Sequence, residues 1–125
     1  MARYTGLKGK AWDAVKAYVR AKEKDCYTCP AKELAGGNAQ AGHFIPVALA
    51  GSNNRLSWDE RQIHLQCGHC NGPGQGQQVI YRARLVLDYG EAAVAEMEAR
   101  RWRVDPIKDW QEVIARFQSL LQHLP

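Results

Sequence analysis

The sequence predicts a single α+β domain that is mainly helical and extends over residues 1–125. Patterns typical of amphipathic helices occupy both ends of the chain, and two Cys-x-x-Cys pairs divide its middle. Between these pairs only two short stretches have the character of β-strands. A chain of 125 residues leaves little room for two independent cores, so we expect one.

The composition is that of a folded domain. Hydrophobic residues make up 46% and charged residues 24%, which argues against a disordered chain. No apolar run approaches the roughly 20 residues that cross a bilayer. The start of the chain also lacks the apolar segment of a secretory signal. These features predict a small, mildly basic domain of the cytoplasm.

The first expected element is a helix over residues 9–24, where Trp12, Val15 and Val19 recur at helical spacing. The formal net charge of +4 is concentrated here, because residues 1–24 hold seven basic and two acidic side chains. The basic ones are Arg3, Lys8, Lys10, Lys16, Arg20, Lys22 and Lys24. Such an arm is suited to contact nucleic-acid phosphates, although a solvated helix face produces the same pattern.

Two short strands are expected next, at residues 43–45 and 62–65. Their spacing suits a hairpin whose second strand leads directly into Cys67. The remainder of residues 30–60 is rich in Gly and Asn and predicts loops.

Three helices are expected in the last third of the chain. The first covers residues 75–88 and ends at Gly90, and the second covers residues 91–102. Asp105 and Pro106 offer an N-cap and a first-turn proline for the last helix. Its apolar face is too wide to leave in water and predicts either core or a dimer contact; it comprises Ile107, Trp110, Val113, Ile114, Phe117, Leu120 and Leu121.

The strongest single signal is the set of four cysteines, Cys26, Cys29, Cys67 and Cys70. Two Cys-x-x-Cys pairs are typical of a tetrahedral Cys₄ zinc site. Disulfides are the weaker interpretation because no secretion signal precedes them. A thioredoxin-like motif would require only one pair within a βαβ unit.

Zinc at these positions would hold a hairpin that carries His43 against the start of a helix that carries Asn71. A neutral imidazole can remove a proton from water as a general base. A divalent ion bound nearby can stabilise charge on a phosphate. A lone histidine on a short strand can equally be structural.

The combined motifs resemble the NinG (Rap) family of phage recombination endonucleases over roughly residues 20–101. The residues that carry this resemblance are the two cysteine pairs, Ala41-Gly42-His43-Phe44, Arg55-Leu56, Gln62-Ile63-His64-Leu65-Gln66, Asn71, Gly76-Gln77, Tyr81 and Tyr89-Gly90. The resemblance implies a zinc-stabilised ββα-metal core of the His-Me finger (HNH-like, treble-clef-like) type at residues 25–90. A basic N-terminal helix (1–24) and C-terminal helices with a possible dimer seam (91–125) would flank this core.

The family resemblance also implies a function. We expect a structure-specific endonuclease that cuts branched DNA, such as Holliday junctions and D-loops, by metal-assisted phosphodiester hydrolysis. Zn²⁺ would serve the structure and Mg²⁺ or Mn²⁺ the chemistry. Branched or double-stranded DNA would be the partner, the protein would be a homodimer, and it would be phage- or prophage-encoded and act in the bacterial cytoplasm. The order of cysteines, histidine and asparagine also resembles endonuclease VII, a phage junction resolvase.

Carried over residue by residue, His43 becomes the general base, and Asn71 and Gln40 become the candidate ligands of the catalytic ion. His64 is expected to face the site as a ligand, an orienter or a phosphate contact. The expected DNA contacts are Lys8, Lys10, Lys16, Arg20, Lys24, Gln77 and Arg82.

Three glutamines depart from the family pattern. Gln40 stands where the pattern has Asp, and Gln62 and Gln77 stand where it often has Asn. Because Mg²⁺ prefers anionic oxygen, a site without Asp would bind it weakly in the absence of DNA. Asp59 and Glu60 are the nearest carboxylates that could compensate. The alternatives to an active nuclease are a zinc-dependent DNA-binding protein without catalysis and a zinc-knuckle interaction adaptor.

Overall fold

The structure is a computed structural model and describes residues 4–125, so Arg3 of the basic arm lies outside the described residues. The architecture is a mainly helical α+β fold, as predicted. Its main elements, in chain order, are α1 (Gly6–Lys22), β1 (Gln40–His43), β2 (Ile63–Gln66), α4 (Gln78–Tyr89), α5 (Glu91–Arg100) and α6 (Trp110–Gln122). The short helical turns are η1 (Gly36–Asn38), α2 (Val47–Ala50), η2 (Arg55–Trp58), η3 (Glu60–Gln62) and α3 (Gly68–Asn71).

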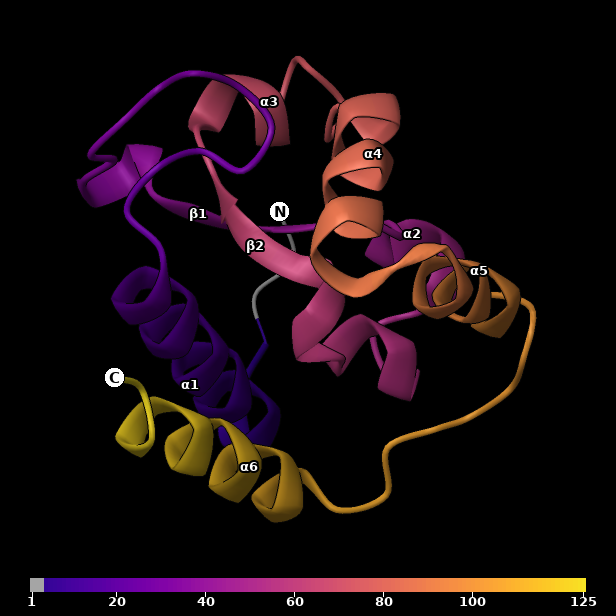
Figure 1. Ribbon diagram of the computed structural model, residues 1–125. Coiled ribbons are helices and arrows are strands. Elements are labelled where there is room, and N and C mark those ends of the chain that lie inside the picture. Colours follow the sequence, from indigo (N-terminus) through magenta and orange to yellow (C-terminus); the bar gives the residue numbers. More distant parts are fainter. Residues whose placement is uncertain (1–3) are drawn as a thin grey trace.

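A two-stranded antiparallel hairpin lies at the centre of the fold, with α1 on one side and α4 on the other (Figure 1). In its register Gln40 pairs with Gln66 and His43 pairs with Ile63. Because side chains alternate along a strand, Gln40 and Gly42 face one side of the sheet while Ala41 and His43 face the other. The α1 side buries Ile63 and other apolar side chains against α1. The opposite side packs against α4.

Tyr81 of α4 connects this helix to the hairpin. Its side chain is fully buried, and its hydroxyl lies 2.7 Å from the carbonyl oxygen of Gly42 and 3.0 Å from that of Gln62. These contacts hold α4 against the end of β1 and against the last residue of η3, the 3₁₀ turn before β2.

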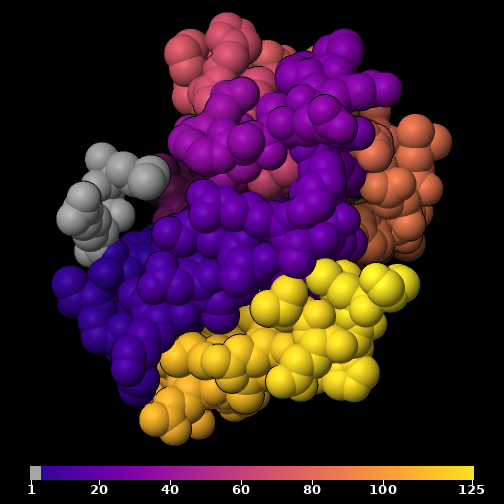
Figure 2. Space-filling view, turned by 90° about the vertical axis from the view of Figure 1, so that its left-hand side faces the viewer, coloured from indigo at the N-terminus to yellow at the C-terminus, as the bar shows by residue number. Residues whose placement is uncertain are grey.

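The C-terminal helix packs along α1, and the two helices lie side by side on one face of the molecule (Figure 2). Phe117 is fully buried there, with its ring centroid 5.9 Å from that of Tyr18. The apolar face of α6 is therefore mainly core and is covered by α1 of the same chain. The predicted homodimer stays a prediction, and it would need a different surface.

The predicted start of the last helix was wrong. The helix begins at Trp110, and its N-cap is Asp109, whose carboxylate accepts hydrogen bonds from the backbone N–H groups of Gln111 and Glu112. The segment at Asp105 and Pro106 instead runs beside the loop that precedes η2. There Ile107 N–H donates to the carbonyl of Asn53, and Arg55 N–H donates to the carbonyl of Asp105. This long-range pairing keeps the chain extended where local capping signals favoured a helix.

The predicted position of the first strand was wrong, because β1 begins three residues and ends two residues earlier than expected. After His43 the backbone N–H of Phe44 bonds to the carbonyl of Gln62, and that of Ile45 bonds to the Gln62 side chain at 2.6 Å. The buried Gln62 side chain thus takes the place of a further backbone hydrogen bond of the sheet, and the chain turns into α2.

Among residues 4–125, no helix is long and apolar enough to span a membrane.

The packing of α6 on α1 makes a stability prediction. Phe117→Ala removes a fully buried ring and leaves a cavity, so it should lower the free energy of unfolding by about 3–5 kcal/mol. Urea denaturation followed by circular dichroism measures this loss. The control is Gln118→Ala on the exposed side of the same helix, for which we expect a change within about 0.5 kcal/mol. Equal effects of the two substitutions would contradict the packing described here.

Candidate functional site

The four cysteines form a compact cluster. Cys26 and Cys29 lie in the loop after α1, Cys67 follows β2, and Cys70 lies in α3. Their Sγ atoms all lie within 4.8 Å of one another, and those of Cys29 and Cys67 are 3.7 Å apart. Tetrahedral zinc with Zn–S bonds of about 2.3 Å separates its sulfurs by about 3.8 Å. The cluster could therefore hold a zinc ion, whereas a disulfide would require sulfurs about 2.05 Å apart.

Backbone N–H groups donate hydrogen bonds to two of the four cysteine sulfurs. The backbone N–H of Cys67 donates to Cys26 Sγ at 3.3 Å, and that of Cys70 donates to Cys67 Sγ at 3.4 Å. Burial opposes ionisation of Cys26, but the hydrogen bonds from the backbone N–H of Cys67 and from Thr28 outweigh it and lower the pKa of Cys26 to about 6. Burial raises the pKa of Cys70 to about 12. Cys26 is thus a thiolate at neutral pH, and a bound metal would displace the proton of Cys70.

Gln40 and Asn71, the two expected ion ligands, lie together on the α4 side of the hairpin. Gln40 Nε2 donates to the carbonyl of Gly37 at 2.8 Å, and Asn71 Nδ2 donates to Gln40 Oε1 at 2.9 Å. The Asn71 oxygen therefore turns toward Gly42, where an added Cβ would lie 2.9 Å from Asn71 Oδ1. In this arrangement Gln40 Oε1 accepts from Asn71 and so orients its amide, and the role of Gln40 as an ion ligand stays a prediction.

Gln66 lies beside Gln40 and Asn71, although the sequence had indicated no role for it. Its side chain is fully buried, and its Nε2 donates to Thr28 Oγ1 at 2.9 Å and to the carbonyl of Gly76 at 3.0 Å. Its Oε1 is buried without a hydrogen-bond partner and lies where a Cβ of residue 42 would be. One signal was present in the sequence: Gln40 and Gln66 are polar residues that a hairpin register can place opposite each other.

His43 lies on the α1 side of the strand. Its Nε2 is 2.7 Å from the carbonyl oxygen of Ser57, and its ring stacks on Trp12 with centroids 5.6 Å apart and planes inclined by 14°. Since a carbonyl only accepts, we assign the proton to Nε2, which leaves the lone pair on Nδ1 free. Burial lowers the pKa of His43, and the bond to Ser57 opposes this shift without cancelling it. The half-buried imidazole is therefore neutral at pH 7.

His64 connects β2 to Glu23, the residue at the end of α1. It is buried, it stacks on Tyr27 with centroids 3.8 Å apart, and its Nδ1 contacts the carboxylate of Glu23. Its Nε2 lies 2.8 Å from the carbonyl oxygen of Arg61. Both ring nitrogens meet oxygen acceptors, so neither is left to ligate an ion. Glu23 also accepts from the backbone N–H of Leu65 at 2.7 Å, which attaches the end of α1 to β2.

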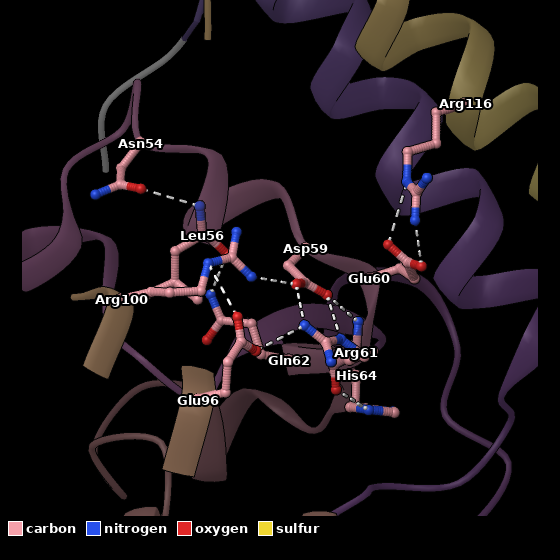
Figure 3. Close-up of polar contacts among 10 residues, drawn as sticks. All are labelled: Asn54, Leu56, Asp59, Glu60, Arg61, Gln62, His64, Glu96, Arg100 and Arg116. Atoms are coloured by element: carbon pink, nitrogen blue, oxygen red, sulfur yellow. Dashed lines mark hydrogen bonds and ion pairs between the residues drawn. The ribbon is translucent and has the colours of Figure 1, made fainter. Parts of the chain in front are cut away.

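Asp59 and Glu60 do not join the cluster at Gly42. Asp59 contacts Arg61 at 2.8 Å and Arg100 at 2.7 Å, and Glu60 contacts Arg116 at 2.6 Å (Figure 3). Burial opposes ionisation of Asp59, but the hydrogen bonds from Arg61 and Arg100 outweigh it and lower the pKa of its carboxyl. These carboxylates attach the turns before β2 to α5 and α6. They are therefore not free to replace an Asp at position 40.

The expected DNA contacts are spread over the surface, and several have partners within the chain. Lys8 contacts Ser52 and Asn53, Lys16 pairs with Asp13, Arg20 donates to the carbonyl of Ala39, Lys24 donates to that of Arg20, and Arg82 pairs with Glu91 and Glu98. Gln77 is the left-handed N-cap residue of α4, and Lys10 is exposed. Phosphate binding by these residues stays a prediction.

The geometry of the cysteine cluster predicts that the protein contains zinc. Protein purified without chelator should contain one zinc per chain, and Cys67→Ser should lose it and unfold, because binding of a structural metal is coupled to folding. Elemental analysis and circular dichroism measure both effects. His69→Ala is the matched control, since His69 lies between Cys67 and Cys70 but is exposed and outside the cluster. Metal-free, fully folded wild type would contradict the assignment.

Comparison with known proteins identifies relatives among phages. The chain is 34% identical over 121 residues to Protein ninG of Escherichia phage 933W, 35% to that of Salmonella phage P22 and 33% to that of Escherichia phage lambda. Each match covers 92% of this chain but only 55–56% of the relative. The chain thus spans about half the length of the relatives it matches. No solved structure matches it significantly.

The family model described as Bacteriophage Lambda NinG protein matches residues 4–125, which is nearly the whole chain. The chain therefore belongs to the NinG family of phage proteins.

Proposed function

We propose that the protein is a metal-dependent DNA endonuclease with a ββα-metal core of the His-Me finger (HNH) type, as expected for the Rap-type recombination enzymes. The observation that supports this most is the state of His43. A neutral, oriented imidazole with a free Nδ1 is next in the chain to a glycine over which two amide oxygens converge. These are the parts that a phosphodiesterase requires, namely a base and a position for a cation.

His43 is the proposed general base. The carbonyl of Ser57 and the indole of Trp12 fix its ring, so no reorientation is needed before the reaction. His43 Nδ1 takes a proton from a water molecule, whose oxygen forms a bond to the phosphorus. The bond between phosphorus and the 3′ oxygen breaks, and the leaving oxygen is protonated by solvent.

Asn71 Oδ1 is the proposed ligand of the catalytic cation, Mg²⁺ or Mn²⁺. When bound, such an ion stabilises negative charge on the phosphate and on the leaving oxygen. Gly42 and His43 are consecutive in β1, and the Asn71 oxygen and the His43 ring lie on opposite faces of this strand. Gln40 keeps the Asn71 oxygen directed at Gly42.

The cysteine cluster is proposed to hold this geometry. Cys67 follows directly on Gln66, and Asn71 follows directly on Cys70. A Cys₄ zinc ion would thus fix the residues on both sides of the candidate site. An isolated two-stranded hairpin is marginally stable in water, so it needs such support.

Branched DNA, including Holliday junctions and D-loops, is the proposed substrate, and the bacterial cytoplasm is the proposed place of action. A four-way junction requires two paired incisions, which favours a homodimer. The exposed basic residues Lys10, Arg20 and Lys24 are the proposed phosphate contacts.

The pKa of His43 sets a prediction for pH dependence. The active form of a general base is the neutral imidazole, so the rate should fall as the pH is lowered through the pKa of His43. Burial places this pKa below its ordinary value of 6.5. Single-turnover cleavage of a four-way junction between pH 5 and pH 8 should therefore show an acid limb below about pH 6.5 and a plateau above it. A rate that still rises steeply above pH 7 would point to a different base.

The direct test of the proposal is incision of a labelled four-way junction with Mg²⁺ or Mn²⁺. Removing a general base typically costs about 10²–10⁴-fold in rate, so His43→Ala should lose cleavage by this factor. His123→Ala should cleave as wild type does, because His123 is an exposed residue near the C-terminus. Junction binding without cleavage in either metal would favour a DNA-binding protein. Absence of salt-sensitive DNA binding would favour an interaction adaptor.

A further inference from the structure

We infer that Gln66 supplies a second oxygen ligand, beside Asn71, to a divalent cation held over Gly42. This inference deepens the proposed function and rests on its catalytic cation. A glutamine in a strand does not by itself indicate a metal ligand, because its amide usually has hydrogen-bond partners among neighbouring residues. The contacts of Gln66 differ from this pattern.

The orientation of the Gln66 amide is fixed. Its Nε2 lies 3.0 Å from the carbonyl oxygen of Gly76, which can only accept, so a flipped amide would place two acceptors against each other. The second contact of Nε2, to Thr28 Oγ1 at 2.9 Å, supports the same orientation. Oε1 is therefore held on the side of Gly42, where it is buried and has no donor.

The orientation of Asn71 is fixed in the same way. Gln40 Nε2 donates to the carbonyl of Gly37, so Gln40 Oε1 is the atom that accepts from Asn71 Nδ2. The remaining atom of the Asn71 amide, Oδ1, is left to face Gly42. Two independent hydrogen-bond chains thus direct two amide oxygens to one point.

Two acceptors that lie close together without a donor between them are unfavourable, and an unpaired buried oxygen destabilises the folded chain. Either a cation or a hydrogen-bond donor would remove this cost. The glycine makes the meeting possible, because any Cβ at position 42 would overlap Gln66 Oε1. Amide oxygens are ligands of Mg²⁺ and of Mn²⁺, which favours the cation.

No carboxylate is among the groups described at Gly42, so the site is neutral. Hard divalent ions bind weakly to neutral oxygens alone, and Mg²⁺ sites are commonly completed by phosphate groups of a substrate. We therefore expect the cation to bind tightly only when a DNA phosphate lies at the site.

The test measures cation binding and not cleavage. It uses the zinc-loaded chain of 125 residues with His43→Ala, so that the DNA stays intact, in complex with a four-way junction. Mn²⁺ affinity is read by electron paramagnetic resonance. Gln66→Met should weaken Mn²⁺ binding by about tenfold or more. Gln66→Glu, which keeps an oxygen and adds charge but loses both donor contacts, should bind Mn²⁺ at least as tightly as the glutamine.

Gln62→Met is the matched control. Gln62 is equally buried, but its Oε1 accepts from Ile45 N–H and its Nε2 donates to the carbonyl of Leu56, so no oxygen is free. Its Mn²⁺ affinity should be unchanged. If Gln66 acted only as a structural support, Gln66→Glu would be as damaging as Gln66→Met. Unchanged affinity in folded Gln66→Met would overturn the inference and leave a water molecule between the two oxygens.

A second measurement avoids substitution of Gln66. Mn²⁺ should broaden the side-chain amide resonances of Gln66 and Asn71 in the DNA complex before it affects the exposed Gln118 in α6. Uniform broadening would overturn the inference even if the Gln66 variants fail to fold. Mn²⁺ binding that depends on Gln66, with no cleavage by the chain that retains His43, would leave the cation site standing and refute the nuclease.

Discussion

The cluster of four cysteines is the constraint on which the rest of the structure depends. It joins the loop after α1 to the end of β2 and to α3, and these segments are about forty residues apart in the chain. The hairpin has only two strands of four residues each, and such a unit needs support from outside. The helices α1 and α4 cover its faces, and the cluster fixes its end. The candidate site lies at this fixed end because Gln66 and Asn71 directly border two of the cysteines.

The two faces of β1 carry different kinds of side chain. The face toward α1 is apolar around His43, and this burial keeps the imidazole neutral. The face toward α4 carries amides whose nitrogens are all engaged, which leaves oxygens at Gly42. The amide oxygens of Gln66 and Asn71 and the ring of His43 are therefore separated by the strand, although Gly42 and His43 are adjacent in the chain.

Much of the fold was predictable, because α1, α4 and α5 follow the apolar period of their own sequences. The last helix was misplaced since Asp105 and Pro106 pair with a loop about fifty residues earlier in the chain, and no local pattern contains that contact. The grouping of the four cysteines was predictable from their spacing. The unpartnered oxygen of Gln66 was not, because it depends on which residues surround Gln66 in space. The ion pair between Asp59 and Arg100 was likewise not predictable, because it depends on where α5 packs.

If the proposed cation site is neutral, binding of the metal ion by the proposed nuclease would depend on DNA. If a DNA phosphate is needed to complete the coordination of the ion, then DNA raises the affinity for the ion, and by thermodynamic linkage the ion raises the affinity for DNA by the same factor. A site with an Asp at position 40 would load its metal before DNA arrives. With Gln40 oriented toward Asn71, the metal would load only where a phosphate reaches Gly42. Gln40 in place of Asp would then make cutting by the proposed nuclease depend on the placement of a DNA phosphate at Gly42.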